Sequence, residues 1–437
     1  MGSNDHSLSP DQKKVYESII DWTKTRHRED DVLTVGGFAG TGKSFLLSRF
    51  AAQTELFVAY ACYTGRAASG LARKLRDAGV QTTLHVHPPN RDGSEQTDPE
   101  ASLPYCSTIH GLIYRPIKDE DSGERTDWDL RQELDRRYDL IVIDEASMVN
   151  EEMEEELRSF GIPILAVGDH GQLEPVEGQS SLLIDPDLRL EKIHRQAESS
   201  PIIKLSRVVR EEGRLDKTLA EPGRLVFYPY NMLEKVVGRA CESPLDNTML
   251  AFRNSTRTKI NKAARKALRL KDDPKKGEPL IALSNYRPVY NGMRGILAED
   301  AVHPNSLPEW MLRADIAFPE EGLSVRTYDI CKAQLNREAK GKDRRGRKNS
   351  YKFSSKDDLR EAGIKVLDFE DAGKLFDYGY ALTVHKAQGS QFPHAIIAMD
   401  WALEERPDDP ERKVDPRRLT YTAITRASER LSILSNL

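Results

Sequence analysis

Residues 37–44 read Gly-Phe-Ala-Gly-Thr-Gly-Lys-Ser, which is the pattern G-x-x-x-x-G-K-S. The β-branched run at 32–35 predicts a buried strand before this loop, and apolar residues at helical spacing in 45–50 predict a helix after it. In that context the loop wraps phosphate oxygens with backbone N–H groups and faces them with the positive end of the helix. The chain is therefore expected to contain an α/β domain that binds a nucleoside triphosphate.

The loop supplies two side chains with separate roles. Lys43 can reach the β- and γ-phosphates, and the hydroxyl of Ser44 can ligate Mg²⁺. The residues expected to contact the nucleotide through the loop are Gly37, Ala39, Gly40, Thr41, Gly42, Lys43 and Ser44. The loop predicts that a triphosphate binds, but it does not reveal what its hydrolysis drives.

Composition excludes several classes of protein. The chain has 437 residues, of which 38% are hydrophobic and 31% charged, and it has no apolar run of about 20 residues that would span a membrane. Its N-terminal residues lack the basic and apolar regions of a signal peptide, and its four cysteines form no C-x-x-C pair. We expect a soluble protein of a reducing cytoplasm, without a zinc site or a disulfide framework. With a net charge of −5, any nucleic-acid site must be a local basic groove.

A second candidate site follows the continuous apolar run at 140–143, which is typical of a central parallel strand. The run ends in Asp144 and Glu145. A carboxylate at this end of a strand lies beside the phosphate loop in a doubly wound sheet. We expect Asp144 to hold Mg²⁺ through water and Glu145 to orient or deprotonate the attacking water.

Three further polar residues are candidates for the same site. Gln172 follows the predicted strand at 164–167, where a neutral donor can sense the γ-phosphate. Arg195 can complete the positive charge around the leaving phosphate. Gln12 stands in a first helix that Ser9 is expected to cap, and its amide could pair with adenine, although such a glutamine is usually only solvated.

Beyond residue 247 the pattern changes twice. A strand at 248–252 opens a second α/β unit, and short β-like pieces separated by proline and glycine fill 271–375, as in a small β-barrel insert. A basic run at 340–348 contacts nucleic acid or is simply solvated; the sequence favours neither. His110 alone is more often structural than functional, and an exposed Trp128 in a polar hairpin either packs on its own domain or offers a stacking face.

Taken in order, the motifs GTGKS, DEAS, GDHGQLEPV, TVHKAQGS and YTAITRA resemble those of superfamily 1 helicases. The resemblance is to the RecD-like branch and, within it, to the Dda helicases of T-even bacteriophages. It runs from Gln12 to Arg426 and leaves the inserts at 77–106 and 300–370 uncovered.

This resemblance implies a fold class, α/β with two RecA-like P-loop NTPase domains, a β-hairpin pin insertion and a small SH3-like β-barrel insertion. The first RecA-like, ATP-binding domain would span 1–187, with the pin at about 112–134. The second would comprise 188–270 and 376–437, and the inserted barrel would be 271–375.

The resemblance also implies roles for single residues. Gln12 would contact adenine, Lys43 the phosphates, Ser44 and Asp144 the Mg²⁺, with Glu145 as base and Gln172 as γ-phosphate sensor. Arg195 and Arg426 would be arginine fingers, and Gly389 would lie at the nucleotide. The contacts to the nucleic-acid strand would come from Thr64, His110, Thr383 and His385, and Trp128 would lie in the pin that splits the duplex.

The implied activity is ATP-dependent 5′→3′ translocation on single-stranded DNA with unwinding of duplex DNA. The cofactors would be ATP and Mg²⁺, and the partners single-stranded and tailed duplex DNA together with single-strand-binding or replication proteins. The protein would be a monomer without a membrane partner. It would work in a bacterial cytoplasm or a phage-infected host and take part in replication, recombination or repair.

One alternative is an ATP-driven remodeller that displaces or loads proteins without processive unwinding. A nucleotide kinase would leave the second α/β unit and the motifs at 383–426 unexplained.

Overall fold

The computed structural model of the chain describes residues 8–25, 31–82, 105–118, 125–175, 182–192, 199–271, 273–286, 288–337, 352–366, 369–403 and 414–436. The chain divides into two compact units, one of residues 1–203 with 409–418 and one of residues 204–408 with 419–437. No helix within the described ranges combines the length and the apolar character needed to cross a membrane.

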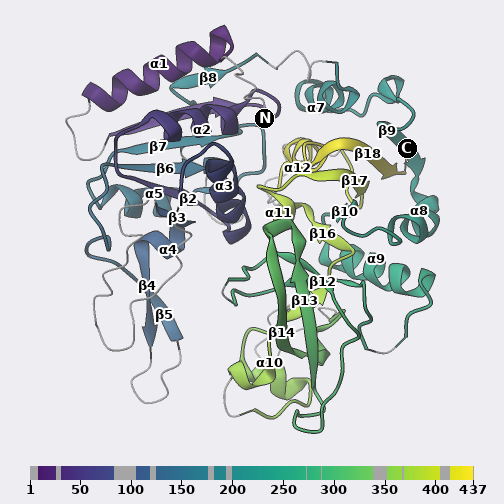
Figure 1. The fold of residues 1–437 in the computed structure, drawn as a ribbon. Coiled ribbons are helices and arrows are strands. Elements are labelled where there is room, and N and C mark those ends of the chain that lie inside the picture. Colours follow the sequence, from purple (N-terminus) through teal and green to yellow (C-terminus); the bar gives the residue numbers. More distant parts are fainter. Residues whose placement is uncertain are drawn as a thin grey trace. The chain divides into compact units, whose positions relative to one another are not determined.

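The first unit is built on a six-stranded parallel sheet of order β3-β2-β6-β7-β1-β8 (Figure 1). Its strands are β1 (Val32–Gly37), β2 (Val58–Cys62), β3 (Tyr105–Thr108), β6 (Leu140–Asp144), β7 (Ile164–Gly168) and β8 (Leu188–Leu190). Its helices are α1 (Pro10–Thr25), α2 (Lys43–Gln53), α3 (Gly65–Asp77), α4 (Ile109–Ile113) and α5 (Glu151–Arg158). The strands predicted at 32–35, 140–143 and 164–167 are confirmed as β1, β6 and β7.

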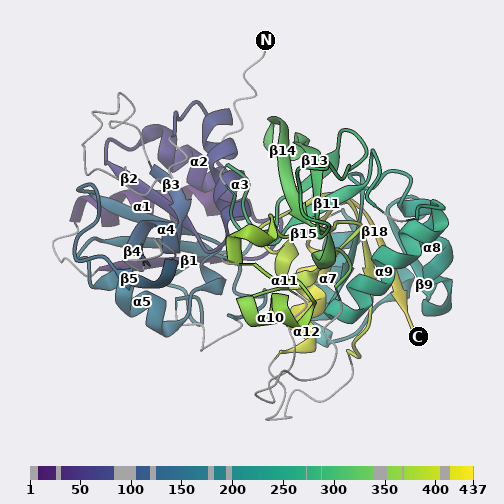
Figure 2. The same cartoon turned by 90° about the horizontal axis from the view of Figure 1, so that it is seen from below.

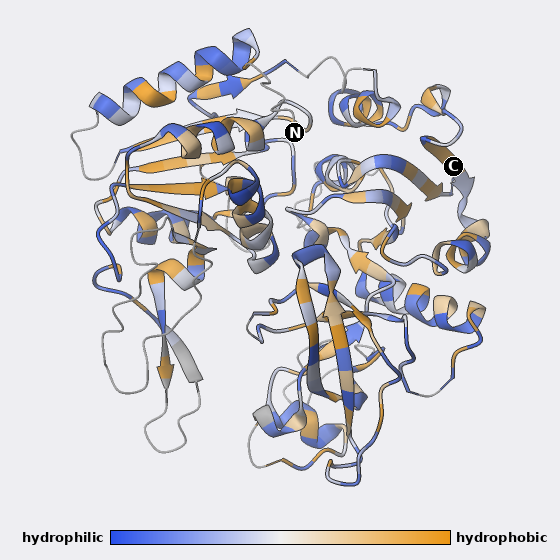
Figure 3. Cartoon of the chain, viewed as in Figure 1, coloured by the Kyte–Doolittle hydropathy of each residue, from blue (hydrophilic) through white to orange (hydrophobic). Residues whose placement is uncertain are grey.

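Both faces of this sheet are buried, which explains why its strands are apolar throughout rather than alternating. Alternate residues of β2 enter two different cores, Val58 and Tyr60 on one face and Ala59 and Ala61 on the other. Helices α1, α2 and α3 cover the first face, and α4 and α5 cover the second (Figures 1 and 2). Figure 3 shows the strands of this sheet as hydrophobic.

A two-stranded hairpin extends from α4, formed by β4 (Tyr114–Lys118) and β5 (Arg125–Leu130). Trp128 pairs across it with Pro116, and Arg115 binds Asp129 at 2.5 Å. Trp128 and Ile117 are 41% and 42% exposed, so the hairpin presents apolar side chains to solvent. Residues 119–124, within the predicted pin, lie outside the described residues, as do the predicted loop at 87–104 and the basic run at 340–348.

The second unit contains a parallel sheet of order β16-β10-β17-β18-β9 and an antiparallel sheet of order β14-β13-β12-β11-β15. The parallel sheet consists of β9 (Leu225–Pro229), β10 (Asn247–Ala251), β16 (Ala381–Thr383), β17 (Phe392–Ala398) and β18 (Ala427–Ser435). The antiparallel sheet consists of β11 (Pro279–Ala282), β12 (Arg294–Leu297), β13 (Met311–Phe318), β14 (Leu323–Cys331) and β15 (Phe376–Tyr378). The helices are α7 (Pro201–Glu212), which begins at the end of the first unit, α8 (Leu233–Ala240), α9 (Asn254–Ala267), α10 (Lys356–Glu361), α11 (Val384–Ala387) and α12 (Pro416–Ile424), which begins in segment 409–418.

One face of α9 binds the antiparallel sheet through two ion pairs. Arg257 forms an ion pair of 2.7 Å with Asp377 of β15, and both side chains are almost fully buried. Two turns further along, Arg265 binds Glu278 at 2.9 Å, just before β11. Because breaking a buried ion pair leaves an uncompensated charge, these contacts hold the antiparallel sheet firmly against the helix.

The expected start of the second domain at residue 188 is corrected by strand pairing. Residues 188–190 form β8, which pairs in parallel with β1, and the first unit continues to Ile203. With three residues, Leu-Arg-Leu, the strand is too short to show a period in the sequence, and only its partner reveals it.

Candidate functional site

The phosphate loop connects β1 to α2, and its backbone explains its glycines. Gly40 and Gly42 both have φ of 84°, in the left-handed region that other residues rarely adopt. A Cβ on Gly37 would lie 2.7 Å from the hydroxyl of Thr41. The loop therefore keeps its turn only with glycine at these positions.

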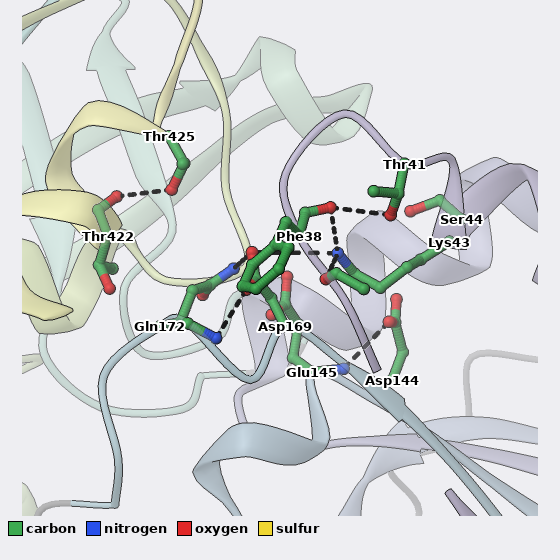
Figure 4. A network of polar contacts seen from close by, with 12 residues as sticks. Phe38, Thr41, Lys43, Ser44, Asp144, Glu145, Asp169, Gln172, Thr422 and Thr425 are labelled. Atoms are coloured by element: carbon green, nitrogen blue, oxygen red, sulfur yellow. Dashed lines mark hydrogen bonds and ion pairs between the residues drawn. The ribbon is translucent and has the colours of Figure 1, made fainter. Parts of the chain in front are cut away.

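Lys43 lies folded across this loop. Its ammonium donates hydrogen bonds to the carbonyls of Gly37 at 2.6 Å and Phe38 at 3.1 Å, and it lies 4.0 Å from the carboxylate of Asp169 (Figure 4). A phosphate oxygen attracts the ammonium more strongly than a carbonyl does, because the phosphate carries a full negative charge. The Lys43 ammonium can thus exchange its hydrogen bonds to the two carbonyls for hydrogen bonds to an anion in the loop.

Asp144 and Glu145 stand at the carboxyl end of β6, with Asp144 level with Cys62 of β2 and Val167 of β7. Asp144 is 8% exposed and accepts a hydrogen bond from the backbone of Glu145 at 3.0 Å. Glu145 itself has φ 58° and ψ 41°, a left-handed conformation that disfavours glutamate. Strained backbone of this kind gathers at functional sites, so the turn is a sign that the direction of this carboxylate matters.

Gln172 and Asp169 follow β7 and face the same region (Figure 4). Gln172 is 3% exposed, and its amide nitrogen lies 3.4 Å from Asp169. Asp169 is fully buried and also accepts a hydrogen bond from Gly171 at 2.9 Å. The sequence reasoning missed Asp169, although a carboxylate directly after the strand beside the phosphate-loop strand was a usable signal.

Gln12 connects α1 to the phosphate loop. Its side chain accepts a hydrogen bond from the backbone of Ser9, whose hydroxyl in turn caps the helix, and its amide nitrogen donates to the carbonyl of Thr41 at 3.1 Å. The predicted cap at Ser9 is confirmed. The side chain predicted to contact adenine therefore lies at the predicted phosphate loop.

The first unit brings together Gln12, Lys43, Ser44, Asp144, Glu145 and Gln172, all predicted from sequence. Arg426 and Gly389 lie in the second unit. Arg426 is 4% exposed at the end of α12, where its guanidinium donates to the carbonyls of Thr422 and Ser390 at 3.0 Å. Arg195 lies outside the described residues.

Thr64 and Thr383, predicted to contact a nucleic-acid strand, both cap a helix that begins where a parallel strand ends. Thr64 stands two residues after β2 and accepts a hydrogen bond from Ala67 at 3.2 Å, and Thr383 is the last residue of β16 and accepts one from Lys386 at 3.4 Å. Thr108 does the same at the start of α4, binding Gly111 at 3.0 Å. Sequence reasoning missed Thr108, although it stands two residues before His110, as Thr383 stands two residues before His385. Helix N-termini at the carboxyl edge of a sheet are suited to phosphate groups.

The two predicted histidines lie among aromatic rings. The ring centroids of His110 and Tyr114 are 5.3 Å apart, and those of His385 and Phe252 are 5.7 Å apart. The ring of Phe252 also meets that of Trp401 edge to face, with centroids 6.4 Å apart. Burial lowers the pKa of both imidazoles below the ordinary value, partly opposed at His110 by the charge of Glu156. Both rings are therefore neutral at physiological pH and offer flat stacking surfaces rather than positive charge.

Lys386, beside His385, yields a prediction about pH. Desolvation, helped by the charges of Arg257 and Lys352 and opposed by Asp377, lowers its pKa to about 7. Between pH 7 and 9 the unfolded chain keeps the proton that the folded chain has lost, so this group makes the folded state more stable as pH rises. In urea denaturation, wild type should gain stability over Lys386→Met across this range, by less than about 1.4 kcal/mol per pH unit. Lys259→Met, at an exposed position of α9, keeps Lys386, so its stability difference from wild type should not change with pH. A stability difference between wild type and Lys386→Met that stays constant from pH 7 to 9 would contradict the prediction.

Comparison with known proteins gives matches to two family models and to several solved structures. Residues 7–227 match a family model described as an AAA domain, and residues 378–434 match one described as a UvrD-like helicase C-terminal domain. One similar solved structure concerns DNA unwinding at forked dsDNA by two coordinating Pif1 helicases; it is 17% identical, covers 99% of this chain and 93% of its own, and has a TM-score of 0.51. Another is the Pif1 helicase from Bacteroides in complex with ADP-AlF3 and ssDNA, also 17% identical, covering 99% and 94%, with a TM-score of 0.51. At this identity the two structures show the fold, a mixed α/β architecture with RecA-like P-loop domains.

Proposed function

We propose that this chain, which belongs to the AAA-domain family and is an ATP-hydrolysing helicase of superfamily 1, moves 5′→3′ along single-stranded DNA and separates duplex strands. The observation that carries the proposal is the gathering of Lys43, Asp144, Glu145 and Gln172 at one edge of the first sheet. The match to a UvrD-like helicase C-terminal domain supports it, and so do two similar structures, one of a helicase in complex with ssDNA and one that concerns unwinding at forked dsDNA.

In the proposed reaction Lys43 binds the β- and γ-phosphates, and Glu145 takes a proton from the attacking water. Ser44 and Asp144 supply a hydroxyl and a carboxylate, the hard oxygen ligands that Mg²⁺ prefers, and the ion would neutralise charge on the phosphates. Gln172 would sense the γ-phosphate, Gln12 would contact adenine, and Arg195, Arg426 and Gly389 would complete the nucleotide site. These roles are assigned from the positions that the residues hold in the motifs resembling those of superfamily 1 helicases.

The strand would contact Thr64, Thr108 and Thr383 through phosphates, and His110 and His385 through stacking. The branch would be RecD-like and closest to Dda helicases, with residues 271–375 as an SH3-like barrel. We further propose a monomer in a cytoplasm that works with single-strand-binding or replication proteins.

Stimulation of ATP hydrolysis tests the substrate class. Single-stranded DNA should raise hydrolysis strongly, and the half-saturating DNA concentration should rise steeply with salt, because phosphate contacts release counterions. Single-stranded RNA of the same sequence is the comparison. Equal stimulation by RNA would contradict a DNA-specific enzyme, and stimulation by neither would contradict the proposal.

We predict that Trp128→Ala slows strand displacement by about tenfold, because an exposed ring at the duplex junction contributes stacking energy. Hydrolysis stimulated by single-stranded DNA should stay within about twofold, since none of the residues assigned to the nucleotide site belongs to β4 or β5. Val325→Ala, at an exposed apolar position of β14, is the control and should change neither rate. If Trp128→Ala unwinds as fast as wild type, the hairpin is not the pin.

A further inference from the structure

Lys74 approaches the nucleotide site from a helix that the reaction does not otherwise use. Its ammonium donates a hydrogen bond of 2.9 Å to the hydroxyl oxygen of Ser44, the residue assigned to Mg²⁺. The contact joins the last turn of α3 to the first turn of α2, two helices that lie side by side on the same face of the sheet (Figures 1 and 2).

Packing fixes this approach. Leu71 and Leu75 of α3 are buried in the same core as Leu47 and Phe50 of α2, so Lys74 is carried to the edge of that core while its own side chain stays exposed. Burial, together with the carboxylates of Asp144 and Glu145, raises the pKa of the Cys62 thiol, and the charge of Lys74 partly opposes this rise. Lys74 therefore contacts one proposed metal ligand, Ser44, and acts on the same thiol as the other, Asp144.

An ammonium and a divalent cation cannot share the oxygen of Ser44. The hydroxyl has two lone pairs, but two cations bound to one oxygen would lie within a few ångströms and repel each other strongly. The side chain of Lys74 is long and exposed, so it can leave the hydroxyl and remain near the phosphates.

We propose that Lys74 is a second cationic residue of the nucleotide site, which holds Ser44 in place of the metal and is displaced when Mg²⁺ binds with nucleotide. This inference rests on the proposed function, because it takes Ser44 to be a metal ligand. Two consequences follow. Lys74 supports nucleotide binding when Mg²⁺ is missing, and it competes with Mg²⁺ when the ion is present, so it reduces the dependence of nucleotide affinity on the metal.

The test is binding of a fluorescent ADP by the full chain, in excess EDTA and across a Mg²⁺ titration. The ratio of the dissociation constant in EDTA to that in saturating Mg²⁺ should rise by about tenfold in Lys74→Met, the size expected for one charge-assisted hydrogen bond. The Mg²⁺ concentration at half-effect should fall. Lys74→Arg keeps the charge and should keep the ratio close to that of wild type.

Arg73→Gln removes one charge from the neighbouring exposed position of α3 and is the matched control. An unchanged ratio in Lys74→Met would overturn the inference, and so would an equal rise in Arg73→Gln, since that would reflect the general field of the helix. If wild type itself binds no ADP, or binds it without any effect of Mg²⁺, the proposed function fails instead.

Discussion

Glu145→Gln is expected to bind ATP as wild type does while hydrolysing it about 100- to 10,000-fold more slowly, the range that general-base catalysis contributes. Glutamine keeps the size of the side chain and its left-handed backbone, so the turn after β6 and the bond between its backbone and Asp144 remain. Only the ability to accept a proton is lost. The measurements are single-turnover hydrolysis and equilibrium binding of ATP.

Glu155→Gln on the exposed side of α5 is the control for this variant and should hydrolyse ATP at the wild-type rate. Hydrolysis by Glu145→Gln within about threefold of wild type would remove Glu145 from the role of base, because one lost general base costs far more than that.

Lys43→Ala is expected to lose ATP turnover by more than about 1,000-fold and to bind nucleotide more weakly, because one positive charge on the transferring phosphate is removed. The structure adds a second reason. Asp169 is fully buried 4.0 Å from the lysine, so without Lys43 its carboxylate would repel an incoming phosphate.

This second reason has its own test. In the Lys43→Ala background, Asp169→Asn should recover part of the lost nucleotide affinity. In the wild-type background, the same substitution should not increase the affinity for nucleotide. Equilibrium binding of fluorescent ADP to the four proteins measures the coupling. Additive effects of the two substitutions would show that Asp169 does not act through the charge of Lys43.

The sequence pointed to the residues of the proposed nucleotide site because each of them follows a strong local pattern. The phosphate loop needs its glycines and Lys43 at fixed spacing, and Asp144 follows a strand whose apolar run is typical of a central position. The structure brings these residues to one edge because all the strands of the first sheet are parallel.

The sequence predicted less where tertiary contacts decide. Strand β8 depends on its partner β1, the left-handed turn at Glu145 leaves no sign in residue type, and Asp169 became a candidate only beside Lys43. Thr108 was hidden because a threonine before a short helix is usually only a cap. The contact from Lys74 to Ser44 joins residues 30 positions apart and depends on how α2 and α3 pack.

The most direct test of the central claim is displacement of a labelled strand from DNA duplexes with a 5′ or a 3′ single-stranded tail. With ATP, the wild-type chain should displace the strand from the 5′-tailed duplex much faster than from the 3′-tailed one, and Lys43→Ala should displace neither. Preferential displacement from the 3′-tailed duplex would contradict the polarity. Strong DNA-stimulated hydrolysis without displacement from either duplex would contradict the helicase and favour an ATP-driven remodeller of protein–DNA complexes.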